Sequence, residues 1–305
     1  MLYRAPDASG AVLTASLLRS PAACAGLAIV LFMTLLALLS IELGEARRSI
    51  LARYVLTHGP HDEDRAIVSP PAPPDARHWL GTDVQRRDLL SRLLHGSRIS
   101  MQVGLGAEAI ALALGVGVGA LAGYRGGWVD AILMRTADVL LSLPLPILAM
   151  AAIAVFETRS MVLIFVVLGL MGWAGIARLV RAQCLSLRAR GYPEAARALG
   201  AGGPRLVMRH LLPGALSPAL VAASVGVAMN ILTEAWLSFI GLGVGGPAVS
   251  WGRMIVDGQP ELTVRPWLCV FPGLALGITV MGFVLLADGL RDALDPKTKL
   301  ATHTT

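Results

Sequence analysis

Long apolar runs without charge constrain this chain of 305 residues more than any other feature. The first run covers residues 21–41, between Arg19 and Glu42. Since a helix rises about 1.5 Å per residue, such a run reaches across the roughly 30 Å hydrocarbon layer of a bilayer. The run is longer than the apolar core of a signal peptide, and no small-residue cleavage pattern follows it. We therefore expect an uncleaved membrane-spanning helix.

Five similar runs follow, so six spans are expected. They lie at about residues 99–124, 138–156, 160–177, 214–239 and 267–287. Only 15% of all residues are charged, whereas soluble domains carry about 25%. Backbone groups in lipid must be hydrogen-bonded within their own segment, which favours helices. The expected fold is an all-α membrane bundle of six transmembrane helices.

Charge distribution indicates the orientation of these spans. The loop between the fourth and fifth spans contains one acid, Glu194, among the basic residues Arg178, Arg181, Arg188, Arg190, Arg197, Arg205 and Arg209. The positive-inside rule places this loop in the cytoplasm, and six spans then place both termini there. The segment 44–98 also carries many arginines but would lie outside. It is long and rich in acids, and long loops follow the rule weakly.

The runs also divide the chain into segments. We expect a cytoplasmic N-terminus (1–20), a first transmembrane helix (21–43), an extracytoplasmic loop (44–98), a core of five helices (99–290) that contains the cytoplasmic loop 182–213, and a cytoplasmic tail (291–305). The proline-rich stretch 69–74 of the outer loop is expected to be extended and poorly ordered. No internal repeat is evident, which argues against an inverted-repeat secondary transporter.

Residues 191–200 of the cytoplasmic loop specify a short helix. Pro193 suits the first helical position, where its missing N–H costs nothing. Glu194 lies in the first turn, where the helix dipole favours a negative charge. Gly200 suits the left-handed conformation that ends many helices. A second short helix is expected to begin at Pro204 and to end before Pro213.

The first of these helices has the properties of a docking element. Ala195 and Ala196 form a face without bulk, so a partner surface can approach closely. Glu194 offers one negative charge among arginines to a donor on that partner. Such a helix can lie in a groove of another protein. The alternative is an ordinary loop that contains a capped helix.

Glu194-Ala195-Ala196, followed by Gly200 and Leu212-Pro213, resembles the EAA motif of ABC importer permeases. Other segments resemble the dipeptide, oligopeptide and nickel branch of that family, in particular its C-type permease subunit. These segments are residues 78–83, 87–100, 232–243, 250–252 and 288–296. The resemblance extends over about residues 78–297, so it does not rest on one short motif.

The resemblance implies roles for two sets of residues. The ATPase-docking set, which contains the coupling helix, is Glu194, Ala195, Ala196, Arg197, Gly200, Leu212 and Pro213. A second set, at family-motif positions with a gating role, is Asp138, Glu234, Gly241 and Gly243. The implied fold is that of a type I ABC importer permease.

The resemblance also implies partners and a location. The chain is expected to pair with a second homologous permease subunit, two ABC ATPase subunits that bind ATP and Mg, and an extracytoplasmic solute-binding protein. The complex is expected in the plasma (inner) membrane of a prokaryote, in contact with lipid and without nucleic acid. The expected cargo is a short peptide, with nickel or related small solutes as the alternative.

The energy for transport must come from outside this chain. Its two lysines, Lys297 and Lys299, do not follow a glycine-rich loop, so no P-loop is present in the sequence. We expect no catalytic, cofactor-binding or metal-binding residues; His58 and His61 of the outer loop could at most hold a metal weakly. An ion-gradient-driven secondary transporter, with Glu108 and Asp138 as proton carriers, is the alternative. A membrane enzyme would need clustered catalytic residues, which the sequence does not indicate.

Charged and special residues within the spans lead to local expectations. Asp138 follows Arg135 at i, i+3 spacing, which predicts an ion pair. Glu108 is expected to pair with an arginine of another subunit, or else to contact a substrate amine. Glu234 suits structural pairing and gating equally well.

Glycine and proline patterns predict how two of the spans pack and bend. Gly115, Gly119 and Gly123 recur every four residues and predict a close-packing helix face. Pro144 and Pro146 predict a kink in the third span.

Overall fold

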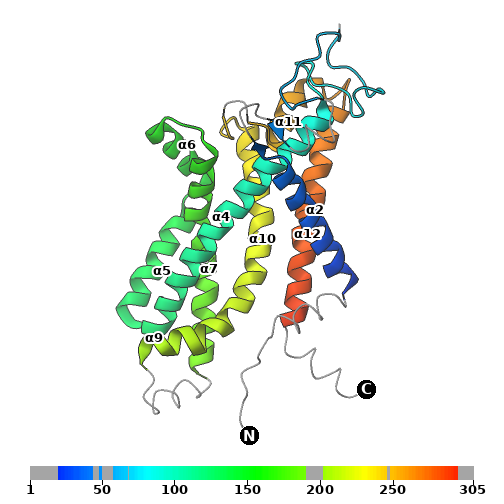
Figure 1. The fold of residues 1–305 in the computed structure, drawn as a ribbon. Helices are drawn as coiled ribbons and strands as arrows, with labels where there is room; N and C mark the ends of the chain where they lie inside the picture. The colour runs from blue at the N-terminus through cyan, green and yellow to red at the C-terminus, as the bar shows by residue number, and fades with distance from the viewer. Residues whose placement is uncertain are drawn as a thin grey trace, which may run out of the picture.

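The computed structural model describes residues 20–43, 48–49, 58–67, 69–189, 202–245 and 248–294. These residues form a helical bundle (Figure 1). Its longer helices are α2 (Pro21–Leu39), α4 (Leu89–Arg125), α5 (Gly127–Ser142), α6 (Leu145–Phe156), α7 (Met161–Arg188), α10 (Leu212–Phe239), α11 (Trp251–Gly258) and α12 (Trp267–Leu294). Two short strands, β1 (Glu42–Leu43) and β2 (Arg48–Ser49), pair in antiparallel fashion.

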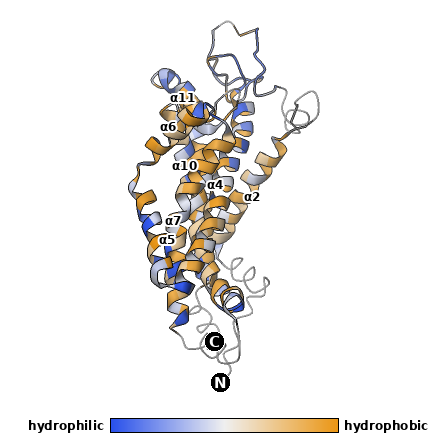
Figure 2. Cartoon of the chain, turned by 90° about the vertical axis from the view of Figure 1, so that its left-hand side faces the viewer, coloured by the Kyte–Doolittle hydropathy of each residue, from blue (hydrophilic) through white to orange (hydrophobic). Residues whose placement is uncertain are grey.

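The expected all-helical membrane fold is confirmed. Five helical segments are each long and apolar enough to cross a membrane, and the count reaches the expected six when the bent pair of α5 and α6 is taken as one span. Apolar residues dominate the middle of the bundle, as Figure 2 shows. Helix α4 begins well before residue 99, α5 begins well before residue 138, and α7 continues past residue 177. Hydropathy locates the lipid-facing part of a helix, whereas capping groups determine where the helix ends.

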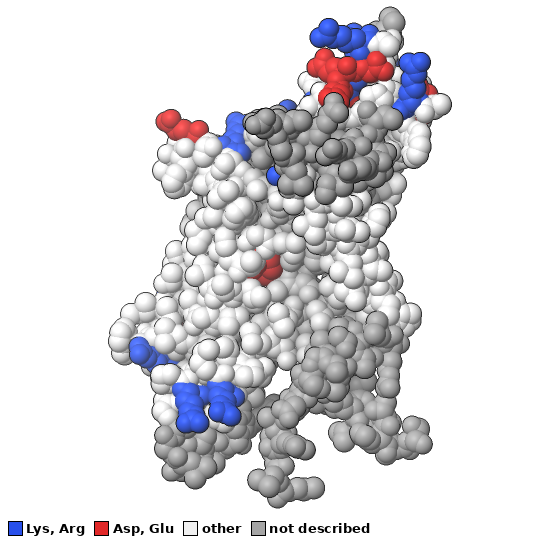
Figure 3. Space-filling model, in the orientation of Figure 1, with Lys and Arg blue, Asp and Glu red and all other residues white. Residues whose placement is uncertain are grey.

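The two ends of the bundle differ in composition. One end, here called the cap end, holds α6, α11 and the described part of residues 58–88; the other, the loop end, holds the short helix α9 (Gly203–Leu206) and the end of α7 (Figure 1). On the face drawn in Figure 3, charged side chains gather at both ends. The belt between the ends is uncharged apart from one acidic spot. This distribution is typical of a membrane-embedded bundle.

The third span is sharply bent, as the prolines predict. Helices α5 and α6 meet at an angle of 90°. Pro144 caps α6 and Pro146 lies in its first turn. Leu143, which precedes Pro144, is extended because the proline ring disfavours the helical region for its predecessor. Helix α5 begins at Gly127, so Asp138 lies inside this helix and not at the start of the span.

Helix α4 packs closely along α7 through its glycine face. A Cβ atom placed at Gly115 would approach the Cβ of Ile176 to 2.6 Å. One placed at Gly119 would approach the carbonyl oxygen of Ala177 to 2.5 Å. Gly123 is equally tight against Cys184. The predicted close-packing face is confirmed, and its partner is α7.

The expected stop before Pro213 is wrong. Helix α9 continues through a π-helical turn, η1 (Val207–Leu211), directly into α10, where Pro213 occupies the first turn. In this turn the Leu212 N–H donates to the carbonyl oxygen of Val207, five residues earlier. The wider turn relieves the clash that a proline ring otherwise makes with the preceding turn of an α-helix.

Candidate functional site

The core of the predicted docking helix lies outside the described residues. This applies to Glu194, Ala195, Ala196, Arg197 and Gly200, since residues 190–201 are not described. The structure does describe both attachment points of this loop, and these determine how the loop connects to the membrane helices.

Arg188 fixes the start of the loop to the end of α4. Its Nη1 donates to the carbonyl oxygens of Gly123 and Tyr124, at 3.0 Å each. Carbonyls in the last turn of a helix lack partners within the helix. A cation is also favourable there because the helix dipole is negative at its C-terminal end. Arg188 therefore joins the last turn of α7 to the last turn of α4.

The end of the loop meets the same part of α4. A Cβ atom at Gly203 would lie 2.4 Å from the hydroxyl oxygen of Tyr124, so a larger residue here would have to displace the Tyr124 side chain. Leu212 packs on the apolar cluster between α4, α7 and α10, whereas Pro213 is exposed. Both ends of the loop therefore converge on the C-terminal turn of α4.

Two ion pairs connect α5 to α7 at the loop end. Arg178 donates to Asp138, and Arg181 donates to both carboxylate oxygens of Asp130. The expected pairing of Asp138 with Arg135 is wrong, because a facing helix brings Arg178 to the carboxylate. The sequence could not indicate this partner, since 40 residues separate it from Asp138.

Glu234 lies in a fully buried polar cluster at the cap end. Ser238, one turn later on α10, donates to its Oε1 at 2.9 Å. Ser100 of α4 and Ser250, the N-cap of α11, interact with the same carboxyl. Neither serine reaches Oε2 with good hydrogen-bond geometry, and Oε2 has no other partner among the described residues. Glu234 thus lies where α4, α10 and α11 meet.

Gly241 and Gly243 form the turn that follows α10. Gly241 has a φ of 82°, in the left-handed region that favours glycine, and its carbonyl accepts from Nη1 of Arg159 at 2.9 Å. A Cβ atom at Gly243 would lie only 1.9 Å from Oγ of Ser238. The turn therefore packs directly against the hydroxyl group that serves Glu234.

Glu108 is paired inside the chain. Its side chain is buried in α4, and Nδ2 of Asn230 on α10 donates to its Oε2 at 3.0 Å. Gly226 makes room for the carboxylate, because a Cβ atom there would lie 2.2 Å from Oε2. Asn230 was not predicted as its partner, although an amide within an apolar run is a usable signal. The expected arginine of another subunit stays a prediction.

At the cap end, charged side chains join the outer segment to the bundle. Asp83 pairs with Arg87 at 2.6 Å and with Arg92 at 3.3 Å, and Arg92 also reaches Asp257 of α11 at 3.5 Å. The expectation of a poorly ordered proline-rich stretch is wrong for residues 69–74: Ala72 exchanges hydrogen bonds with Thr82, at 3.0 Å in both directions.

His78 is the buried centre of this outer segment. Its Nδ1 lies 2.9 Å from Oδ1 of Asp88, and its Nε2 lies 3.3 Å from Oδ2 of Asp64. Burial lowers the pKa of His78, but the hydrogen bonds to both carboxylates outweigh burial, so the pKa is raised above its ordinary value. The pKa of Asp64 is lowered, first by the backbone N–H of Ala66 and then by His78. No local pattern in the sequence predicts that these three residues meet.

Comparison with known proteins identifies the bundle. Residues 115–300 match the family described as the inner membrane component of binding-protein-dependent transport systems. The chain belongs to this family. It is a multi-pass inner membrane permease, the non-catalytic membrane subunit of an ABC importer. The family resemblance seen in the sequence is therefore confirmed.

Three relatives illustrate the match to this permease. The glutathione transport system permease protein GsiD of Pectobacterium atrosepticum is 42% identical over 74% of this chain and 75% of its own length. The oligopeptide transport system permease protein OppC of Bacillus subtilis is 39% identical over 76% of this chain and 75% of its own. OppC of Escherichia coli K12 is 42% identical over 81% of this chain and 82% of its own length.

Proposed function

We propose that this permease carries short peptides. The relatives described above are named for oligopeptides and for glutathione, itself a small peptide. Nickel or a related small solute is the second candidate, which rests only on the sequence resemblance. A solute-binding protein on the outer side would deliver the cargo, and a second homologous permease subunit would form the other half of the pathway.

We further propose that the loop between α7 and α9 docks one of the two ATPase subunits onto this permease, and that the second permease subunit docks the other. One observation carries this proposal: Arg188 and Gly203, on either side of the loop, both contact the last turn of α4. A motion imposed on Glu194, Ala195, Ala196, Arg197 and Gly200 would therefore reach α4, α7 and α10 together. ATP and Mg would be bound by the ATPases, and this chain would need no cofactor of its own.

In this proposal ATP binding draws the ATPases together, and the loop transmits their rigid-body motion to the spans. The pathway would then alternate between inward and outward openings, and hydrolysis would reset it. Asp138, Glu234, Gly241 and Gly243 would contribute to gating through the contacts described above. The ion pair of Asp138 joins α5 to α7. At the cap end, Glu234 and Gly243 both contact Ser238, and Gly241 of the same turn accepts from Arg159.

The proposed orientation places the loop end and both termini in the cytoplasm. The arginine-rich loop and the positive-inside rule support it. Residues 44–98 would then form the extracytoplasmic segment, and 99–290 the permease core. The cap end, with α6 and α11, would face the solute-binding protein.

Co-purification from native membranes tests the docking proposal. The tagged chain would be extracted in mild detergent beside a Glu194→Lys variant, and partners identified by mass spectrometry. We expect a P-loop ATPase to accompany the native chain and to be lost from the variant, since reversing the charge opposes docking. Glu157→Lys is the matched control, because Glu157 is an exposed acid at the opposite end of the bundle.

The same experiment can contradict the proposal. Retention of the ATPase by Glu194→Lys would rule out the docking role of this helix, and equal loss from Glu157→Lys would show a general charge effect. Uptake of a labelled tripeptide by cells that express the complex tests the cargo. Uptake that a proton ionophore abolishes while ATP levels are held constant would instead favour a secondary transporter.

A further inference from the structure

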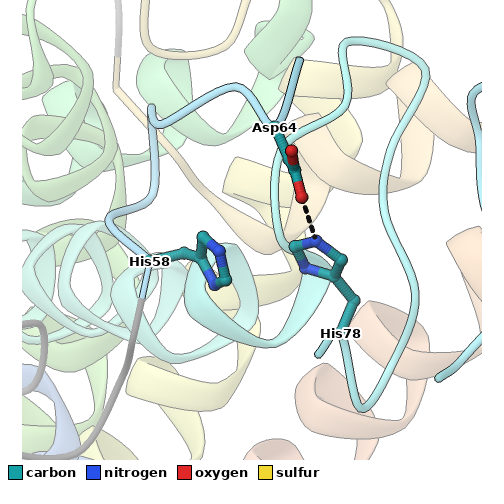
Figure 4. Close-up of side chains that lie close together, drawn as sticks. All are labelled: His58, Asp64 and His78. Carbon is teal, nitrogen blue, oxygen red and sulfur yellow. Dashed lines mark hydrogen bonds and ion pairs between the residues drawn. The ribbon is translucent and has the colours of Figure 1, made fainter. Parts of the chain in front are cut away.

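Three potential metal ligands meet in the outer segment at the cap end. His58, Asp64 and His78 each offer one ligand atom, and these atoms all lie within 4.8 Å of one another. The two imidazole rings are close neighbours, with centroids 4.7 Å apart. Figure 4 shows Asp64 and the ring of His58 both beside the ring of His78. The sequence suggested His58 together with His61, but the fold groups His58 with two other residues.

The spacing of this cluster suits a small divalent ion. Ligands bound to Zn²⁺ at about 2.0–2.1 Å in tetrahedral geometry lie about 3.3 Å from one another. Nε2 of His78 and Oδ2 of Asp64 are 3.3 Å apart, so this pair already has the separation of two such ligands. The ligand atom on His58 lies within 4.8 Å of the other two, so it would have to move closer to them to complete the geometry. His58 is only partly buried, so its side chain has room to move.

Asp88 prepares His78 for this role. Metal-bound histidines commonly donate their other ring N–H to a carboxylate, which fixes the tautomer. Nδ1 of His78 lies 2.9 Å from Oδ1 of Asp88, and a proton on Nδ1 leaves the Nε2 lone pair facing Asp64. Asp88 is itself fixed, because it is the N-cap of α4 and its Oδ2 accepts from the backbone N–H of Ser91 at 2.7 Å. Both His78 and Asp88 are buried.

We propose that His58, Asp64 and His78 bind one divalent transition-metal ion of the Zn²⁺ class on the cap end of this permease. Two imidazole nitrogens and one carboxylate oxygen suit Zn²⁺ and its borderline neighbours, and disfavour Ca²⁺ and Mg²⁺. Three protein ligands leave a fourth position for water or for a donor group from a partner. The ion would join residues 58–64 to the N-terminus of α4. In its absence the His78 ring hydrogen-bonds to Asp88 and Asp64.

Zinc titration of the full-length chain in detergent tests the proposal. The affinity tag must contain no histidine, and the protein is first stripped with EDTA and dialysed. Competition with a chromophoric chelator should then give one Zn²⁺ per chain. We expect His58→Ala to weaken Zn²⁺ binding at least tenfold. His61→Ala, the matched histidine of the same segment, should leave the affinity unchanged.

A second variant tests the orienting carboxylate. Asp88→Asn retains a good N-cap for α4, yet an amide is a poorer acceptor for the His78 N–H. We expect it to weaken Zn²⁺ binding by about 10–100-fold. Melting temperatures of the metal-free variants, measured beside the native chain, separate lost ligands from lost folding.

Cobalt provides a spectroscopic signature of the same site. The native chain and His61→Ala should both give the visible d–d bands of four-coordinate Co²⁺, and His58→Ala should lose them. No saturable Zn²⁺ binding by the native chain would overturn the proposal. Equal weakening by His58→Ala and His61→Ala would also overturn it, because a nonspecific histidine site would then explain the data.

Discussion

Glu108 is a carboxylate within an apolar helix. Its surroundings indicate whether it acts as a proton carrier, as in a secondary transporter, or has a structural role. Its only described hydrogen-bond partner is Asn230, and the residue is 6% exposed. A proton carrier needs access to water on at least one side of the membrane. A carboxylate held by an amide from the facing helix is better suited to joining α4 to α10. We therefore assign Glu108 a structural role.

Substitution of Glu108 tests this role. Glutamine has the same shape and can still accept from Asn230, so Glu108→Gln should retain at least half of the native peptide uptake. Asn230→Leu should destabilise the chain by about 1–3 kcal/mol, because it leaves a buried acceptor without its donor. Uptake assays and thermal unfolding in detergent measure the two effects. Complete loss of uptake in Glu108→Gln, with normal stability, would instead indicate a proton carrier.

At the scale of helices, local sequence patterns predicted helix bends and close-packing faces correctly. Contacts between residues far apart in the sequence could not be predicted. Pro144 and Pro146 predicted the bend between α5 and α6, because proline acts on its own backbone and that of its neighbours. Glycine spacing predicted the close face of α4 for a similar reason. The partnership of Asp130 with Arg181 could not be predicted, because it depends on how α5 lies against α7 across 51 residues of sequence.

At the candidate site, too, the local features could be predicted from the sequence and the long-range contacts could not. The composition of residues 191–200 indicated a helix, and the family resemblance added its docking role. Nothing local indicated that Arg188 would reach the carbonyls of α4, or that His78 would lie between two carboxylates. Pro213 misled because a stop is the common outcome for proline, and the π-helical turn that accommodates it has no sequence signature of its own.

Close contact between α4 and α7 predicts that substitutions at two nearby glycines of α4 differ strongly in their effect on stability. Gly119→Leu should destabilise the bundle by about 3 kcal/mol or prevent folding, because a Cβ atom there would already lie 2.5 Å from the Ala177 carbonyl. Gly117→Leu is the matched control, since nothing lies within 4 Å of a Cβ atom at Gly117. Thermal unfolding and size-exclusion profiles should separate the two variants. Equal stability of both would contradict the packing described for this helix pair.

For the molecule as a whole, charge separates two ends across an apolar belt. The proposed orientation depends on which end lies in the cytoplasm. Arginines of the loop end, such as Arg205, argue for that end. The cap end carries arginines too, and arginines pair with acids at both ends. Many of the cap-end arginines belong to the long segment 44–98, and long loops follow the positive-inside rule weakly.

Labelling of single cysteines tests this orientation. In a background without the native Cys24, Cys184 and Cys269, a membrane-impermeant maleimide should label Glu157→Cys in intact cells. It should label Arg205→Cys only after the cells are permeabilised. Both positions are exposed, so access and not burial should decide the result. The reverse pattern would invert the topology and contradict the cytoplasmic docking loop.

Helix α4 has a consequence for how the two sides of the membrane communicate. It is a single helix of 37 residues, about 55 Å long at 1.5 Å per residue. Arg188 braces one terminus beside the loop, and Asp88 caps the other beside His78. Because the helix is continuous between these two points, it moves as a rigid body. A displacement of either terminus therefore also displaces the other. In the proposed orientation, arrival of cargo outside and the state of the nucleotide inside would thus be signalled along one element.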